Sequence, residues 1–271
     1  MADKRSPVFF LPHGGGPLPL LGDPGHASLS NFIRKLGEDY RRQYANPSAI
    51  LVVSAHWEAT TAALTSAAAP ELLFDYSGFP PDSYQYRYPA AGAPALAADI
   101  AKQLEQHGFT SQLDNQRGLD HGVFVPLLML WPQADVPVLQ LSLQRHLDPA
   151  QHIKLGEAIA FLRQKNVLII GSGMTFHNMR AFFQPGLVSP EQVSAFNQYL
   201  IDSVNPALRY DEQANKLAAW LDAPYARLMH PREEHLLPLH VCFGAGKGSS
   251  AKLLFQDDVI QREVLAFGWF D

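Results

Sequence analysis

Three histidines come directly after apolar runs of the kind that form buried strands. They are His13 after residues 8–12, His56 after 50–55 and His177 just past 167–173. The carboxyl ends of parallel strands meet at one edge of a sheet, so we expect these three imidazoles to open onto one cleft. Imidazoles that converge from separate elements suit Zn, Fe, Ni or Cu. The spacing therefore predicts a metal site at this edge.

A fourth histidine, His235, begins the apolar segment 236–239 directly after Glu233 and Glu234. This pattern is typical of the mouth of a late helix, and we expect the side chain to face the same cleft. A single histidine in such a place is more often a hydrogen-bonded structural residue than a metal ligand. The metal prediction therefore depends on the coincidence of several histidines.

The remaining histidines give weaker signals. His121 follows Asp120, whose carboxylate could fix the tautomer of the imidazole or could cap the next helix, and the pattern leaves both open. Four histidines in polar loops or helix flanks are interpreted as solvated: His26, His107, His146 and His152. His230 and His240 are interpreted as structural.

Three other kinds of site fit the sequence poorly. The glycine-rich stretch 244–248 lacks the Ser or Thr that must follow Lys247 in a phosphate loop. Ser172 lacks the glycines two residues to either side that a serine nucleophile elbow needs. The same segment is a poor dinucleotide fingerprint, because Phe176 occupies the place of the third glycine.

Strand and helix patterns alternate along the chain. Runs typical of buried strands occur at 8–11, 50–54, 138–143, 167–170 and near 252–255. A one-faced helical pattern follows a Ser28 or Ser30 cap, and capping residues followed by proline begin further helices at Asp148 and Ser189. The alternation predicts an α/β fold with a mostly parallel central sheet and helices on both faces. Because no linker or repeat is visible, we expect residues 1–271 to form a single domain.

Composition excludes several classes of protein. The formal net charge is −5 and charged residues are 17% of the chain, so the surface does not attract nucleic acid or anionic membranes by bulk charge. The only cysteine, Cys242, cannot form an internal disulfide, which favours a reducing, cytoplasmic setting. The apolar run before His13 is too short for a signal peptide, and 123–131 is about half of a membrane span. We expect a soluble protein that is not secreted.

Taken in order, six segments resemble the class III extradiol ring-opening dioxygenases, most closely the DOPA 4,5-dioxygenase type. They are PHGGGP at 12–17, VSAHWE at 53–58, DYSGFPP at 75–81 with RYP at 87–89, LDHGVFVPL at 119–127, GSGMTFHN at 171–178 and EHLLPL at 234–239. The match runs from about residue 9 to residue 246, nearly the whole chain. The resemblance implies a single-domain α/β oxidoreductase that opens aromatic rings.

The resemblance also implies one divalent metal per chain, Fe(II) in active enzymes and often Zn(II) in isolated ones. Carried over by motif, the metal ligands would be His13, His56 and His235. His177 would be the acid–base histidine, close enough to the metal to be a fourth ligand when substrate is absent, and His121 would be a catalytic residue lining the substrate and oxygen pocket. The related protocatechuate branch has a glutamate in place of His235, so Glu233 and Glu234 stay open as the third ligand.

The implied partners are a small aromatic diol and O2, and the implied product is of the hydroxymuconic semialdehyde type. Trp57, Tyr88 and Phe176, together with Phe79, are candidates to pack against the aromatic ring, although they fit ordinary core positions equally well. An all-imidazole site would also suit a zinc-dependent hydrolase. A non-catalytic binding protein could keep the same fold and histidines. Neither nucleic acid nor membrane is an expected partner.

Overall fold

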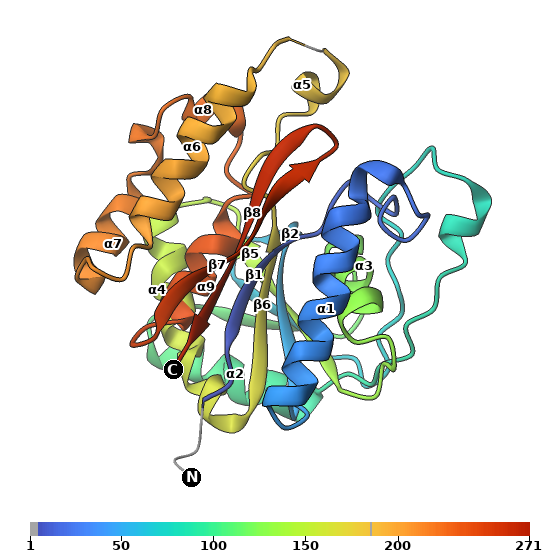
Figure 1. Cartoon of the computed structure of the whole chain (residues 1–271). Helices are drawn as coiled ribbons and strands as arrows, with labels where there is room; N and C mark the ends of the chain where they lie inside the picture. Colours follow the sequence, from blue (N-terminus) through green and yellow to red (C-terminus); the bar gives the residue numbers. More distant parts are fainter. Residues whose placement is uncertain (1–4, 185) are drawn as a thin grey trace.

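The computed structural model describes residues 5–184 and 186–271, and within them the strands form one eight-stranded sheet (Figure 1). The strand order is β4-β3-β5-β2-β6-β1-β8-β7. In chain order the strands are β1 (Val8–Pro12), β2 (Ala49–Ala59), β3 (Ala62–Thr65), β4 (Ser111–Asp114), β5 (Val138–Gln144), β6 (Val167–Gly173), β7 (Ser250–Val259) and β8 (Arg262–Phe270). The strands expected from the sequence are β1, β2, β5, β6 and β7, and all are present.

The middle of the sheet is parallel, as predicted. Strands β5, β2, β6 and β1 pair in parallel, and so do β3 and β4. The outer pairings are antiparallel: β3 with β5, and β8 with both β1 and β7. The sequence did not predict β3, β4 or β8. The first two have four residues each, too few for a periodic signal, and β8 contains Gly268, which is unusual inside a strand.

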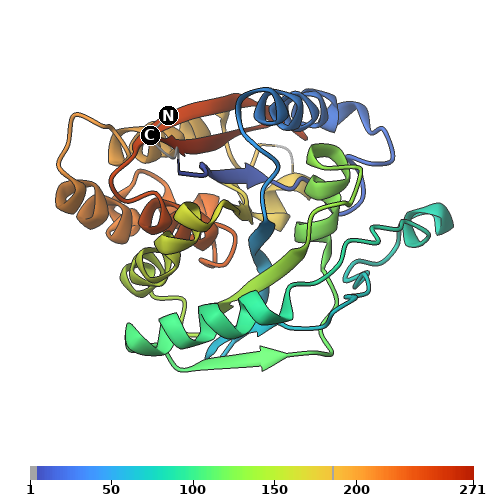
Figure 2. The same cartoon turned by 90° about the horizontal axis from the view of Figure 1, so that it is seen from below.

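Helices cover both faces of the sheet, as predicted (Figure 2). Helices α1 and α3 pack together on one face, where α3 contacts β2 and β6. Helix α9 lies on the other face against β6, β1 and β2, and α4 packs on it. The helices are α1 (Ala27–Gln43), α2 (Pro94–Gln106), α3 (His121–Leu130), α4 (Pro149–Ile159), α5 (Met179–Phe183), α6 (Pro190–Ser203), α7 (Tyr210–Ala218), α8 (Ala226–Met229) and α9 (Leu237–Ala245).

Two of the three predicted helix starts are confirmed. Asp148 accepts a hydrogen bond from the third residue of α4, and Ser189 forms a complete capping box at α6. The prediction for α1 was wrong, because this helix begins at Ala27, directly after a short 3-10 turn. Ser28 and Ser30 lie inside α1 and donate their hydroxyl protons to Asp257 and to the carbonyl of Pro19.

Two glycines allow backbones to approach closely beneath the cleft. A Cβ on Gly156 of α4 would lie 2.1 Å from the carbonyl oxygen of Val241 in α9, so these helices pack in backbone contact. A Cβ on Gly173 would lie 2.3 Å from the carbonyl oxygen of His235. That carbonyl accepts a hydrogen bond from Met174 (2.9 Å). The end of β6 therefore holds the backbone of His235 in place.

The histidines outside the cleft only partly follow the sequence interpretation. His107 and His146 are exposed, as predicted, and His230 and His240 are fully buried. The prediction that His152 is solvated was wrong, because its ring is fully buried and both its nitrogens contact backbone groups.

Among the described residues, no helix combines the length and hydrophobicity needed to cross a bilayer.

Candidate metal and catalytic site

The sheet register places His13 and His56 side by side. Ser172 of β6 pairs with Leu11 of β1 on one side and with Ser54 of β2 on the other. Each histidine lies two residues beyond this shared position, and their Nε2 atoms are 3.0 Å apart. The pairing of β2 with β5 shifts register across His56, and such irregularities re-aim side chains beside active sites.

Both imidazoles are neutral at pH 7. Burial lowers the pKa of His13 and of His56 well below the usual range, and the neighbouring imidazoles lower it further. The Nδ1 atom of His13 lies 3.2 Å from the Ser172 hydroxyl, and that of His56 lies 3.8 Å from the Asp75 carboxylate. A metal ion bound by both Nε2 atoms would require the proton of each ring on Nδ1, and the Ser172 hydroxyl and the Asp75 carboxylate lie on that side of the two rings.

Asp75 also holds His121. Its Oδ1 atom lies 2.8 Å from the Nδ1 of His121 and accepts the backbone N–H of the same residue at 3.0 Å. Burial would raise the pKa of Asp75, but the hydrogen bonds from His121 outweigh it and lower the pKa overall. The Asp120 carboxylate neither contacts the His121 ring nor caps helix α3, so both predictions for it were wrong. It accepts hydrogen bonds from Ser54, Gln140 and Arg117 instead.

Glu234 holds the two remaining imidazoles of the cleft. Its Oε1 atom is 2.9 Å from the Nδ1 of His235 and 3.4 Å from the Nδ1 of His177, and the two rings stack with centroids 3.3 Å apart. Burial lowers the pKa of His235 to about 4, although Glu234 opposes this shift. Burial would raise the pKa of Glu234, but hydrogen bonds from His177 and His235 outweigh it and the pKa lies well below its usual range. Glu233 pairs with Arg227.

The five histidines lie together and include two groups that could each hold a metal ion. One nitrogen each from His13, His56 and His121 lies within 4.8 Å of the others, and the same holds for one atom each from His177, Glu234 and His235. The ring of His235 is 4.9 Å from that of His56 between centroids. The Nε2 of His235 is buried and has no hydrogen-bond partner among the described residues. Neutral imidazoles whose second nitrogen faces a carboxylate or hydroxyl are the ligand arrangement that metals select in proteins.

A cavity of about 480 Å³ opens above the cluster. Its lining includes the five clustered histidines and also contains Leu18, Tyr76, Ser77, Phe79, Met174, Met179, Phe182, Phe183, Ile260 and the glycines at 14–16. Phe79 therefore lies in the cavity wall, as the sequence allowed. The cavity volume is large enough for a substituted aromatic ring.

The other three aromatic candidates lie outside the cavity lining, which corrects the expectation that they contact substrate. Trp57 is buried on the opposite side of β2 from His56, with the Arg117 guanidinium 4.8 Å from its ring centre. Tyr88 is buried and donates to the carbonyl of Trp131. Phe176 is fully buried. The burial and contacts of these three residues support their alternative role as ordinary core residues.

His26 supports the glycine loop that follows His13. The sequence interpretation of His26 as solvated was wrong: the ring is fully buried, its Nδ1 faces Asp23 at 2.7 Å and its Nε2 accepts the backbone N–H of Gly15 at 3.0 Å. Gly14 has a φ of +79°, which favours glycine, and a Cβ there would lie 2.8 Å from the His26 ring. In the sequence, the only indication of the contact between Asp23 and His26 is that they lie three residues apart.

Comparison with known proteins identifies the family. Residues 7–264 match the model of a protein family that is described as "Catalytic LigB subunit of aromatic ring-opening dioxygenase". The dioxygenase tasH of Hapsidospora irregularis is 39% identical, over 97% of this chain and 85% of its own length. The 4,5-DOPA dioxygenase extradiol of Beta vulgaris is 38% identical, over 93% of this chain and 91% of its own.

A solved structure supports the same conclusion for the fold. An uncharacterized protein from Escherichia coli K12 superposes with a TM-score of 0.79 at 29% identity, covering 97% of this chain and 99% of its own. The single-domain α/β architecture and the ordered motifs thus agree with the sequence match over nearly the full length. The chain belongs to the class III extradiol ring-opening dioxygenases, a family of oxidoreductases.

Proposed function

We propose that the chain is a non-haem Fe(II)-dependent extradiol dioxygenase that opens a small catechol with O2, giving a hydroxymuconic semialdehyde-type product. The observation that carries the proposal is that the Nε2 atoms of His13 and His56 lie 3.0 Å apart, that the buried Nε2 of His235 has no hydrogen-bond partner among the described residues, and that all three rings line one cavity. Bound Fe(II) would supply the one-electron exchange with O2 that zinc cannot. Zn(II) would fit the same nitrogens in isolated protein.

Three histidines are proposed to hold one metal per chain: His13, His56 and His235. His13 follows β1, His56 lies in β2 and His235 lies in the turn before α9, and each has an outer group at Nδ1. Glu234 is bonded to His235 and lies beside His177, so it would orient ligands without being one. Three protein ligands on one side would leave positions open toward the cavity, where the two oxygens of a catechol can bind.

His177 is proposed as the acid–base residue. Its side chain is 24% exposed, more than those of His13 and His235, and it lines the cavity. Glu234 at its Nδ1 leaves the other ring nitrogen to accept a catechol proton, and the carboxylate would stabilise the resulting imidazolium. The same nitrogen could return a proton later in the reaction. His121, held by Asp75, would place its ring against the bound substrate and oxygen.

Metal content and turnover of matched variants test these roles. We expect His13→Ala and His56→Ala to abolish metal binding and His177→Gln to retain most of it, with turnover lower by roughly 10²- to 10⁴-fold. His107→Ala is the control, because that side chain is exposed and lies outside the cavity lining. Loss of metal in His177→Gln as severe as in His13→Ala would make His177 an obligatory ligand. Ester or amide hydrolysis by zinc-loaded protein, without oxygen uptake by iron-loaded protein, would favour a hydrolase.

A further inference from the structure

The backbone of His56 lies where the pairing of β2 with its neighbours breaks off. The pairing of β2 with β6 ends at Ser54, and the register of β2 with β5 is interrupted between Val53 and Glu58. His56 lies inside this interruption. Peptide groups of a strand that leaves its ladder need other partners, and those partners then decide where the side chain points.

Two side chains bind the peptide groups of His56. The Ser54 hydroxyl accepts the N–H of His56 at 3.2 Å, and the Arg117 guanidinium donates to the His56 carbonyl at 3.1 Å. The same guanidinium lies 4.8 Å from the centre of the Trp57 ring, and this cation–π contact helps to hold it in place. The backbone of a proposed metal ligand is therefore fixed by side chains on both sides.

Asp120 holds both of these side chains. Its Oδ1 atom accepts the hydroxyl proton of Ser54 at 2.7 Å, and its Oδ2 atom accepts from Arg117 at 3.1 Å and from the side-chain amide of Gln140. An aspartate at the N-cap position ordinarily accepts N–H groups of its own helix. The fully buried carboxylate of Asp120, which precedes α3, instead connects β2, β5 and the loop before the helix.

Gly122 lets the first turn of α3 lie directly against this network. A Cβ at Gly122 would lie 2.4 Å from the Ser54 hydroxyl oxygen and 3.1 Å from the Cδ2 atom of His56. The rings of His56 and His121 are 3.9 Å apart between centroids. The residues on either side of His121 thus contact the segment that carries His56, so the two imidazoles are positioned together.

We propose that Asp120 is a positioning residue of the metal site. By holding Ser54 and Arg117 it fixes the backbone of His56, and with it the direction of the His56 imidazole. The inference rests on the proposed function, because His56 is there a metal ligand. The position of the ring can also be measured without metal, so the two proposals can fail separately.

Asp120→Asn tests this role because it keeps the size of the side chain and removes one of its two acceptor oxygens. Ser54, Arg117 and Gln140 must then share a single acceptor, and the backbone of His56 loses part of its support. We expect the Kd for Co²⁺ to rise by about 10- to 100-fold, the range typical of losing a group that orients a ligand. The absorption spectrum of the bound Co²⁺ should change as well.

Asp148→Ala is the control for a loss of stability alone. The Asp148 carboxylate caps α4 by accepting the N–H of Gln151, and it lies outside the cavity lining. The variant should lower the Tm and leave the affinity and the spectrum of Co²⁺ unchanged. If Asp120→Asn also lowered only the Tm, Asp120 would merely stabilise the fold and the proposal would be overturned.

Arg117→Gln tests the same contact at a half-buried side chain, which keeps the proposal testable if Asp120→Asn does not fold. It removes the donor to the His56 carbonyl and should also weaken Co²⁺ binding about tenfold or more. Because both side chains act on the same backbone, the double variant should lose less than the product of the two single losses. Affinity equal to that of the parent protein, or losses that simply multiply, would overturn the proposal.

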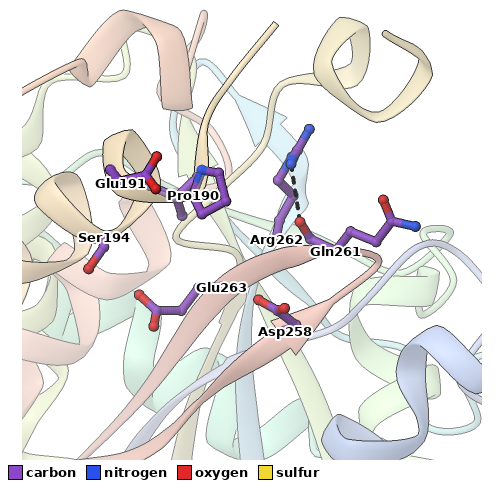
Figure 3. A pocket seen from close by; sticks show the side chains of 8 residues that line it. Pro190, Glu191, Ser194, Asp258, Gln261, Arg262 and Glu263 are labelled. Atoms are coloured by element: carbon purple, nitrogen blue, oxygen red, sulfur yellow. Dashed lines mark hydrogen bonds between the residues drawn. The ribbon is translucent and has the colours of Figure 1, made fainter. Parts of the chain in front are cut away.

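Arg262→Gln is the matched control for the arginine. Arg262 is also half-buried, donates to the carbonyls of Gln261 and Ala181, and lies 5.7 Å from the centre of the Phe176 ring. Figure 3 shows it at the turn between β7 and β8, where it lines a different pocket. This variant should keep the Co²⁺ affinity of the parent protein. A loss equal to that of Arg117→Gln would show a general effect of removing such an arginine, and would overturn the proposal.

The position of the His56 ring is tested without metal by proton–nitrogen correlation spectra of the imidazoles. In metal-free Asp120→Asn and Arg117→Gln, we expect the His56 signals to shift. The signals of His152, a buried ring outside the cavity lining, should stay unchanged. This result in a protein that binds no metal would refute the proposed function and leave the positioning role standing. Unshifted His56 signals would overturn the positioning role.

Discussion

Replacing Glu234 by glutamine should weaken metal binding although Glu234 is not a proposed ligand. The carboxylate contacts His235 at 2.9 Å and His177 at 3.4 Å, both through Oε1, and so fixes which nitrogen of each ring carries the proton. An amide is a weaker, uncharged acceptor, and its NH2 group would face a ring nitrogen that should itself be a donor. Loss of such an outer partner typically costs about 10- to 100-fold in metal affinity, or roughly 1.4–2.7 kcal/mol.

The assay is competition for Zn²⁺ against a chromophoric chelator, with thermal unfolding of each variant to verify folding. Glu233→Gln is a matched control, because the neighbouring carboxylate pairs with Arg227. Glu58→Gln is a second control, since it removes the main partner of Arg232, which also contacts Glu234. Unchanged affinity in Glu234→Gln, or an equal loss in either control, would refute the reasoning.

Three further outcomes are expected. Asp75→Asn should lower kcat by about 10- to 100-fold, because His121 loses the carboxylate that orients it; steady-state kinetics with unchanged kcat would contradict this. The pKa of His152 is about 4 in the folded protein and about 6.5 in the unfolded chain. Its neutral ring therefore stabilises the fold fully above pH 6.5, and this contribution falls as the pH drops toward 4, by about 2 kcal/mol at pH 5. In urea unfolding, His152→Gln should lose less free energy of unfolding between pH 7 and pH 5 than the parent protein does. Gly156→Ala should cost about 1–3 kcal/mol, since its Cβ would overlap the carbonyl of Val241; an unchanged Tm would contradict that contact.

The sequence located the imidazole cluster because a simple geometric rule applies to it. His13, His56 and His177 follow strands of a parallel sheet, and such strands end at one edge whatever loops lie between them. The pairing of Ser172 with both neighbouring strands then brings the first two histidines into contact. Nothing beyond strand identity was needed for this part of the prediction.

The groups that orient the imidazoles were not predictable in the same way. Asp75 is 46 residues from His121 in the chain and lies in a loop without regular structure, so no periodic pattern connects them. The aromatic candidate Trp57 failed for another reason: residue type does not tell which side of a strand faces the cavity. Trp57 follows His56 directly, and the alternation of side chains along a strand turns it away.

The central claim is tested most directly by oxygen uptake of anaerobically Fe(II)-loaded protein with 4-propylcatechol, recorded together with the absorption spectrum of the product. The account predicts one O2 consumed per catechol opened, a product spectrum of the semialdehyde type, and no uptake by zinc-loaded protein. Iron-loaded protein that binds the catechol but consumes no oxygen would contradict it.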